Sequence, residues 1–257
     1  MSVHYEEYGD KNGPLLLFLH GGGVSGWMWK RQVEHFSDYY CIVPDLPEQG
    51  LSKQTPPFSM ESSAEAMLEL IENKANGMSV NVVGFSLGAQ VLVQMLSMKP
   101  DLIDYAMINS ALVVPQPAMA RWIGPSIKLM HPLIRNRSFS RLQSKTLYVQ
   151  DDDFERYFEE SKQITAEALI RVLQENMSFQ IPSQFSRAQS QMLVTVGDKE
   201  KGMMRKSAKL LSDANPNCHA VVLPNIGHGI SMAAPQAFND MLRAWLEQGL
   251  LPEGKPC

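Results

Sequence analysis

Cysteine is scarce in this sequence. The chain of 257 residues contains three cysteines, Cys41, Cys218 and Cys257. Their odd number and wide separation argue against a disulfide framework and against closely spaced zinc ligands. We therefore expect a fold that depends on a packed apolar core.

The sequence also lacks an excess of positive charge and a long hydrophobic run. Its 23 basic and 27 acidic residues give a net charge of −4, and no basic cluster of the kind that binds nucleic acid occurs. The most hydrophobic stretches, such as residues 15–19, end after a few residues, whereas about 20 are needed to cross a bilayer. Residues 1–10 are polar and mildly acidic, unlike a secretory signal. We expect a cytoplasmic protein that binds neither nucleic acid nor membranes.

Apolar residues, by contrast, are plentiful. They make up 44% of the chain against 19% charged residues, which is typical of a folded domain, and the length fits one domain or one core with a large insertion. Short apolar runs alternate with segments of helical periodicity, which indicates parallel strands joined by crossover helices. The predicted strands are residues 2–9, 15–19, 40–43, 80–83, 105–108, 191–196 and 220–223. Helices are predicted at residues 59–75, with a capping box of Ser62 and Glu65, at residues 87–98 and near the C-terminus, whereas residues 252–257 are expected to fray.

Residues 112–188 interrupt this alternation. They contain helix-like stretches but no convincing buried strand, and prolines are frequent in their first part. Loops of this length without structure of their own are rare. We therefore predict a core of residues 1–111 and 189–257 that carries a helical lid formed by residues 112–188.

The predicted lid offers two kinds of side chain for ligand binding. Most of its methionine and aromatic side chains should pack on the core, and a minority should line an adaptable apolar pocket. Arg121, Arg135 and Arg137 could hold a substrate carboxylate, although arginines on such helices are more often solvated. The acidic stretch between residues 151 and 160 indicates a solvated face or a helix start rather than a metal site, because no accompanying ligand set is present.

The strongest chemical signal is the sequence GFSLG at residues 84–88, between a predicted strand and a predicted helix. A serine on such a sharp turn has its hydroxyl pushed out of the fold, and glycines avoid collisions with the neighbouring strand and helix. The helix that begins at Leu87 directs N–H groups and the positive end of its dipole toward the same point. Ser86 is therefore the predicted nucleophile, and the N–H of Leu87 is a predicted oxyanion donor.

A second signal, HGGG at residues 20–23, directly follows the predicted strand at residues 15–19. A glycine loop can bring its N–H groups close to a developing negative charge, so Gly22 is the predicted second oxyanion donor. A phosphate-binding loop would instead need a lysine followed by serine or threonine, and here VSGW follows. For His20 we expect a structural hydrogen-bonding role.

The third signal, NIGHG at residues 225–229, follows a predicted strand. Flanking glycines would let the imidazole of His228 project toward Ser86, where it can act as general base and then as general acid. Such a histidine needs an acid to orient it, and the loop after residues 191–196 offers two carboxylates, Asp198 and Glu200. Their spacing alone leaves both open.

The sequence resembles the α/β-hydrolase superfamily over nearly the whole chain apart from the lid. The resemblance lies in the order of four features along the chain: a glycine loop, a nucleophile turn, an acid and a histidine. The resemblance implies an α/β fold, with a mostly parallel sheet flanked by helices and a helical lid inserted after the sixth strand. It favours Glu200 over Asp198, because the acid of many members is the fourth residue of a Gly-x-x-Asp motif. The loop at residues 44–52 departs from the usual family sequence, since Glu48 and Gln49 replace a glycine and a histidine.

The sequence thus predicts a serine hydrolase that cleaves a small to medium carboxylic ester or a related acyl compound through an acyl-enzyme intermediate. Its partner is a small-molecule acyl substrate, and no cofactor or metal is implied. A C–C bond hydrolase or a lyase on the same triad remains an alternative, for which arginine or asparagine should face the pocket. The second alternative is a ligand-binding, receptor-like protein with vestigial hydrolase activity, which would bind its ligand tightly and turn it over very slowly.

Overall fold

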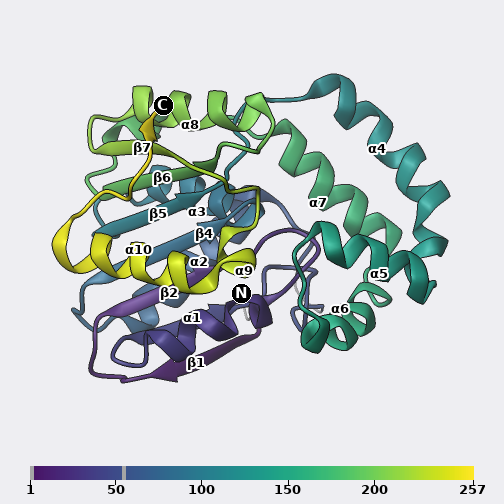
Figure 1. Ribbon diagram of the computed structural model, residues 1–257, viewed down its shortest axis with the longest axis horizontal. Helices are drawn as coiled ribbons and strands as arrows, with labels where there is room; N and C mark the ends of the chain where they lie inside the picture. Colours follow the sequence, from purple (N-terminus) through teal and green to yellow (C-terminus); the bar gives the residue numbers. More distant parts are fainter. Residues whose placement is uncertain (1–2, 54–55) are drawn as a thin grey trace.

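A single β-sheet runs through the centre of the protein (Figure 1). The structure, a computed structural model, describes residues 3–53 and 56–257, and within these ranges eight strands form the sheet in the order β1-β3-β2-β4-β5-β6-β7-β8. The outermost strands β1 and β8 pair antiparallel with β3 and β7, and the other pairs are parallel. The strands are β1 (Tyr5–Gly9), β2 (Leu15–Leu19), β3 (Tyr40–Pro44), β4 (Val80–Phe85), β5 (Tyr105–Asn109), β6 (Gln191–Gly197), β7 (Cys218–Leu223) and β8 (Lys255–Pro256).

Both faces of the sheet are covered by helices, as the continuous apolar runs of its central strands predict. In β2, Leu15, Leu17 and Leu19 belong to one apolar cluster with α2, α3 and α8, while Leu16 and Phe18 belong to a second cluster with α1 and α10. The flanking helices are α1 (Lys30–His35), α2 (Met60–Lys74), α3 (Leu87–Met98), α8 (Gly202–Ala214), α9 (Ile230–Ala233) and α10 (Pro235–Gln248), with a 3-10 turn, η1 (Gly26–Trp29). The predicted fold class is confirmed.

Two local predictions about the ends of elements are wrong. Helix α2 is capped by Ser59, whose side chain accepts a hydrogen bond from the N–H of Ser62, and not by a box of Ser62 and Glu65. The backbone of Ser59 is extended, as an N-cap requires, whereas Ser62 already lies within the helix. At the C-terminus, residues predicted to fray include β8, which pairs with Val221 and Val222 at the edge of the sheet, a position that tolerates the missing N–H of Pro256.

Residues 112–188, which we call the helical insertion, lie between β5 and β6 and form a group of helices at one end of the sheet (Figure 1). They comprise α4 (Pro117–Met130), η2 (His131–Arg135), α5 (Arg137–Thr146), η3 (Asp151–Asp153), α6 (Phe154–Ser161), α7 (Ala166–Ser178) and η4 (Ser183–Arg187). The prediction placed this segment after a sixth strand, but it follows the fifth, because the described residues before it form only β1 to β5.

The helical insertion is tied to the sheet and its loops by polar contacts. Arg171 of α7 forms an ion pair with Glu48, at 2.7 Å between Nη2 and Oε1. Glu160 of α6, expected on a solvated face, instead accepts hydrogen bonds from Ser25 Oγ and Trp27 Nε1, at 2.8 and 2.9 Å. These contacts hold α6 and α7 against the loops that follow β2 and β3.

Candidate active site

Ser86 stands at the sharp turn between β4 and α3. Its backbone adopts φ 53° and ψ −109°, a strained conformation for a residue other than glycine. The turn is held by a hydrogen bond from the N–H of Ser86 to the carbonyl of Asn109, at 2.9 Å. A Cβ atom on Gly88 would collide with the carbonyls of Leu19 and His20 at the end of β2. The predicted steric reason for a glycine at this position is confirmed.

The hydroxyl of Ser86 faces the imidazole of His228, which lies in the loop after β7. Ser86 Oγ is 3.0 Å from His228 Nε2, and the other ring nitrogen, Nδ1, is 2.6 Å from Oε2 of Glu200. The three side chains come from loops at the carboxyl ends of parallel strands, which meet at one edge of such a sheet. The structure therefore joins Ser86, His228 and Glu200 in one hydrogen-bonded chain.

Glu200 is the buried member of this chain, with a side chain 2% exposed. Its second oxygen, Oε1, accepts hydrogen bonds from the N–H of Gly197 and the hydroxyl of Ser110, both at 2.8 Å. Burial raises the pKa of Glu200, but the hydrogen bonds from His228, Gly197 and Ser110 outweigh this effect and leave the pKa below its ordinary value. The carboxyl group is therefore ionised at neutral pH and suited to accept from the imidazole.

Asp198, the competing acid, points elsewhere. The backbone N–H of Asp198 donates to the carbonyl of Leu223 and so continues the pairing of β6 with β7. Asp198 is exposed. The chain then turns, with the N–H of Glu200 donating to the carbonyl of Gly197, and this turn brings the Glu200 side chain under His228. Of the two acids that the sequence offers, only Glu200 contacts the histidine among the described residues.

The two predicted oxyanion donors lie beside the serine. Gly22, in the loop after β2, packs against the side chain of Leu87, and both residues line a cavity together with Ser86. The N–H of Leu87 belongs to the first turn of α3 and has no partner within the helix. Gly22 and Leu87 therefore lie beside Ser86 at one cavity, and their role as oxyanion donors stays a prediction.

His20 has the structural role that was predicted for it. The buried imidazole accepts a hydrogen bond from the N–H of Leu46 at Nε2, and its Nδ1 lies 2.8 Å from the carbonyl of Gly21. Burial lowers the pKa of His20, so the ring is neutral, with its proton on Nδ1. The hydrogen bond from Leu46 to His20 thus links the glycine loop to the loop after β3.

Two cavities meet at Ser86. The wider, of about 780 Å³, lies on the His228 side and reaches α8 and the loop that carries Glu200. The narrower, of about 260 Å³, lies on the side of Gly22 and Leu87 and is walled by the helical insertion. Both are partly enclosed by side chains of residues 112–188, among them Met119 and Leu173.

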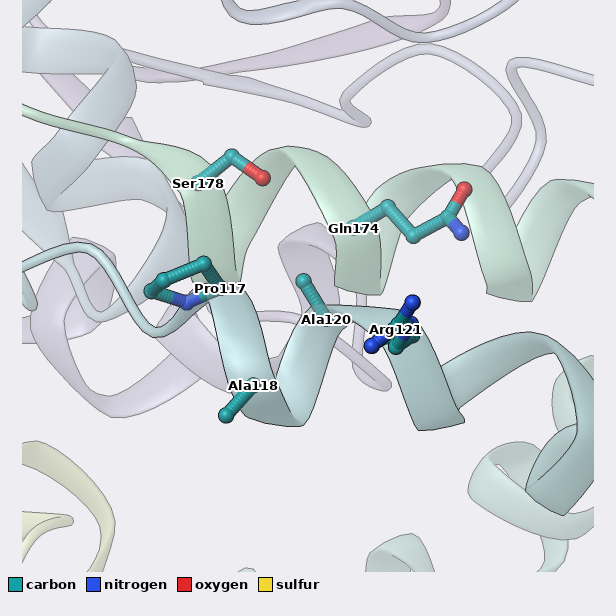
Figure 2. A pocket seen from close by; sticks show the side chains of 6 residues that line it. All are labelled: Pro117, Ala118, Ala120, Arg121, Gln174 and Ser178. Atoms are coloured by element: carbon teal, nitrogen blue, oxygen red, sulfur yellow. The ribbon is translucent and has the colours of Figure 1, made fainter.

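The arginines of the helical insertion do not line either of these cavities among the described residues. Arg121 lines a separate surface hollow between α4 and α7, with Gln174 and Ser178 on the opposite helix (Figure 2). Arg137 forms an ion pair with Glu155 within the insertion. The expectation that these arginines are mostly solvated therefore fits the structure better than a role in holding a substrate.

Two residues near the site were not found from the sequence. Ser110 follows β5 with a φ of 56° and donates its hydroxyl to Glu200, although the two residues are 90 positions apart. Tyr148 of the helical insertion packs on the histidine loop, where a Cβ atom on Gly229 would lie 2.6 Å from its ring. The glycine beside His228 thus makes room for Tyr148, and a contact of this kind has no local sequence signal.

Neither a metal centre nor a membrane-spanning helix is found in the part of the chain that the structure describes. No three histidine, cysteine, aspartate or glutamate side chains are grouped there so that they could hold a metal ion. No helix within residues 3–53 and 56–257 combines the length and apolar character needed to span a bilayer.

Comparison with known proteins agrees with this geometry. The family model described as "Alpha/beta hydrolase family" matches residues 16–241, which include Ser86, Glu200 and His228. The chain belongs to the alpha/beta hydrolase family. Several relatives carry the names of hydrolytic enzymes, among them a lipase, a carbamate hydrolase and a methyl ester esterase. Membership of this family accounts for the sheet order and for the turn that carries Ser86.

Three proteins illustrate the range of similarity. Lipase LipV of Mycobacterium tuberculosis is 29% identical over 120 residues, which are 47% of this chain and 43% of that protein. (E)-2-((N-methylformamido)methylene)succinate hydrolase of Acinetobacter baylyi is 23% identical over 254 residues, which are 96% of this chain and 94% of that protein. The crystal structure of MGS-M2, an alpha/beta hydrolase enzyme from a Medee basin deep-sea metagenome library, has a TM-score of 0.80 at 20% identity and covers 97% of this chain and 96% of its own.

Proposed function

We propose that this alpha/beta hydrolase is a serine hydrolase that cleaves a small to medium carboxylic ester or a related acyl compound. The observation that carries the proposal is the hydrogen-bonded chain from Ser86 through His228 to Glu200, with Ser86 on the strained turn between β4 and α3. A hydroxyl is a weak nucleophile until a neighbouring base takes its proton, and that base needs an acid to orient it.

The proposed reaction has two halves. His228 Nε2 takes the proton of Ser86 as Oγ attacks the ester carbonyl carbon, and the N–H groups of Gly22 and Leu87 stabilise the resulting oxyanion. The tetrahedral intermediate then expels the alkoxide, which receives the proton from His228 and leaves as an alcohol. A water molecule, deprotonated by His228, attacks the acyl-enzyme in the same way and releases the carboxylic acid and free Ser86. The ionised carboxylate of Glu200 stabilises the imidazolium form in both halves.

We further propose that residues 112–188 act as the lid of this enzyme, over a core of residues 1–111 and 189–257. Side chains of the helical insertion wall both cavities that reach Ser86, and they supply much of the apolar surface there. The substrate is then a small molecule that is selected by this segment. The insertion would also exclude water from the carbonyl while it reacts.

A C–C bond hydrolase or a lyase on the same triad is supported less well. That chemistry was expected to place arginine or asparagine toward the pocket, and no arginine among the described residues lines either cavity. Asn176 lines both, but its Nδ2 already donates to Gln90 Oε1 at 2.7 Å, which leaves Asn225, in the loop before His228, as the other asparagine at the wider cavity. A receptor-like protein would bind a ligand tightly with very low turnover, and the complete hydrogen-bonded chain at Ser86 favours an enzyme.

The proposal is tested with p-nitrophenyl esters of increasing acyl length. We expect the wild-type protein to turn over the short and medium esters, and Ser86→Ala to lose at least about 10³-fold in kcat because the nucleophile is gone. Ser212→Ala, at a partly exposed serine of α8 that lines neither cavity, is the matched control and should retain wild-type rates. If wild type hydrolysed none of the esters, or if Ser86→Ala kept its activity, the proposal would be wrong.

A further inference from the structure

The two cavities at Ser86 differ in which catalytic groups they contain. His228 lines the wider cavity and does not line the narrower one, whereas Gly22 and Leu87 line the narrower cavity. In ester cleavage the proton carried by His228 must reach the oxygen of the leaving group. The leaving group therefore belongs in the wider cavity. The acyl group, which extends from the other side of the carbonyl carbon, belongs in the narrower one.

The narrower cavity contains no charged side chain among the described residues. It is walled mainly by aliphatic side chains, such as Ile127, Leu169 and Leu173, and its polar groups are neutral. Burial raises the pKa of Tyr157, so this phenol is also uncharged at neutral pH. A carboxylate on the acyl group would lose its hydration here without gaining a charged partner, which is costly. The cavity volume of about 260 Å³ also falls below the range typical of drug-sized ligands.

The wider cavity is apolar and positively charged. Its apolar wall includes Met119, Met177, Met203 and Met204. Its rim carries Lys199 and Lys201, and the described residues provide no ion pair for either. Its one carboxylate, Glu200, is buried and hydrogen-bonded to His228, so the two exposed lysines outnumber the negative charge at this cavity. A methionine wall accepts varied apolar shapes, and the lysines favour an anion beside it.

We infer that the substrate joins a short or medium, uncharged acyl group to a larger, apolar leaving group that carries an anion, and that Lys199 and Lys201 recognise this anion. The inference rests on the proposed serine hydrolase and adds the substrate class to it. It also distinguishes this chain from a hydrolase of dicarboxylate half-esters, whose negative charge would have to enter the narrower cavity.

Three esters that differ in whether and where they carry a negative charge test the inference. They are the butyrate of methyl 4-hydroxybenzoate, which is neutral, the butyrate of 4-hydroxybenzoate, with the carboxylate in the leaving group, and the hemisuccinate of methyl 4-hydroxybenzoate, with the carboxylate in the acyl group. Each kcat/KM is normalised to the alkaline hydrolysis rate of the same ester. We expect the anionic leaving group to be preferred over the neutral ester about fivefold, and the neutral ester over the hemisuccinate at least about tenfold.

The double variant Lys199→Gln, Lys201→Gln should bring the ratio of anionic to neutral leaving group close to one, and high salt should lower the wild-type ratio. Lys206→Gln, at an exposed lysine of α8 that does not line the cavity, is the control and should keep the wild-type ratio. A wild-type ratio of one or less, or a hemisuccinate cleaved as well as the butyrate, would overturn the inference while the proposed function stood. Cleavage of none of the three esters would instead count against the proposed function itself.

The assignment of the acyl group to the narrower cavity has its own test. Leu173→Phe reduces the space in this cavity and should lower the kcat/KM ratio of p-nitrophenyl hexanoate to p-nitrophenyl acetate about tenfold. Met204→Phe makes a comparable change in the wider cavity and should leave that ratio near the wild-type value. The opposite pattern, with the ratio lowered by Met204→Phe and not by Leu173→Phe, would place the acyl group in the wider cavity and contradict the inference.

Discussion

At the scale of single residues, the orientation of His228 depends on one buried carboxylate. Glu200 has both oxygens occupied, Oε2 by His228 and Oε1 by Gly197 and Ser110. Every acceptor that faces the interior is therefore satisfied, which is what allows a carboxylate to stay ionised in a buried position. The fixed carboxylate in turn selects the imidazole tautomer whose Nε2 can accept the proton of Ser86.

Replacement of this carboxylate tests the role of Glu200. We expect Glu200→Gln to lower kcat about 10³-fold, because an amide neither stabilises the imidazolium nor holds the required tautomer. Asp198→Asn, two residues away on an exposed side chain, should stay within about threefold of wild type. Steady-state kinetics on one p-nitrophenyl ester measure both. A severe loss confined to Asp198→Asn would assign the acid to Asp198.

The residues of the candidate active site were not equally predictable from the sequence. Ser86 and His228 stand in short motifs that are recognisable by their glycines and by the strands before them. In the structure, Ser86 Oγ lies 3.0 Å from His228 Nε2. Glu200 and Asp198 share one loop, so spacing alone left both open and only the resemblance favoured Glu200. Ser110 and Tyr148 were missed because each acts on a residue far away in the chain, and such contacts exist only after folding.

At the scale of elements, one side chain holds a helix of the insertion against the loop after β3. The backbone of Glu48 has a φ of 63°, which is unusual for a residue with a side chain of this size. The carboxylate of Glu48 accepts hydrogen bonds from Nε and Nη2 of Arg171, at 2.9 and 2.7 Å, and from the N–H of Phe58, at 2.8 Å. These contacts offset the backbone strain and link α7 to the core.

Removal of the cation in this link should loosen α7. We expect Arg171→Met to lower the free energy of unfolding by about 1 kcal/mol, a modest value because the arginine is partly exposed. Thermolysin should then cleave within residues 112–188 faster than in wild type. Lys209→Met removes an exposed pair with Asp213 within α8 and should change neither the Tm nor the cleavage rate. Equal effects of the two variants would contradict this account of the link.

Element boundaries were predictable where burial leaves a pattern. The central strands are covered on both faces, so their sequences are continuous apolar runs, and residues 15–19 were predicted with the bounds of β2. Strand β8 consists of two exposed residues, one of them proline, and carries no such pattern. The contacts of Glu160 with Ser25 and Trp27 could not be predicted either, because a glutamate in an acidic stretch looks like a surface residue until its partners are known.

At the scale of the whole molecule, the antiparallel strand β1 forms one edge of the sheet, and hydrogen bonds and ion pairs of Glu7 hold it in place. Glu7 of β1 accepts hydrogen bonds from Lys74 at the end of α2, from Tyr40 of β3 and from Lys11. These donors, chiefly Lys74, lower the pKa of Glu7 from 4.5 to about 2. The edge of the sheet is thus stabilised by an ionised carboxylate.

This pKa shift predicts how stability depends on pH. A carboxylate with a lowered pKa in the folded state contributes stability that is fully present above the unfolded value of 4.5 and is lost as the pH falls toward about 2. Wild type should therefore have a higher Tm than Glu7→Gln at pH 6, and this difference should narrow as the pH decreases from 4.5 to 2. Thermal unfolding of both proteins over this range measures it. A difference that stayed constant or widened in acid would contradict the assignment.

The proposed hydrolysis depends on Ser86 as a nucleophile activated by His228, and covalent labelling tests this role most directly. Wild type, Ser86→Ala and His228→Gln are treated with a fluorophosphonate, and the modified residue is located by mass spectrometry of peptides. We predict one adduct on Ser86 in wild type, with loss of esterase activity in step with labelling, no adduct in Ser86→Ala and at least about 10²-fold slower labelling in His228→Gln. An unlabelled Ser86 in wild type, or labelling at the same rate without His228, would contradict the account.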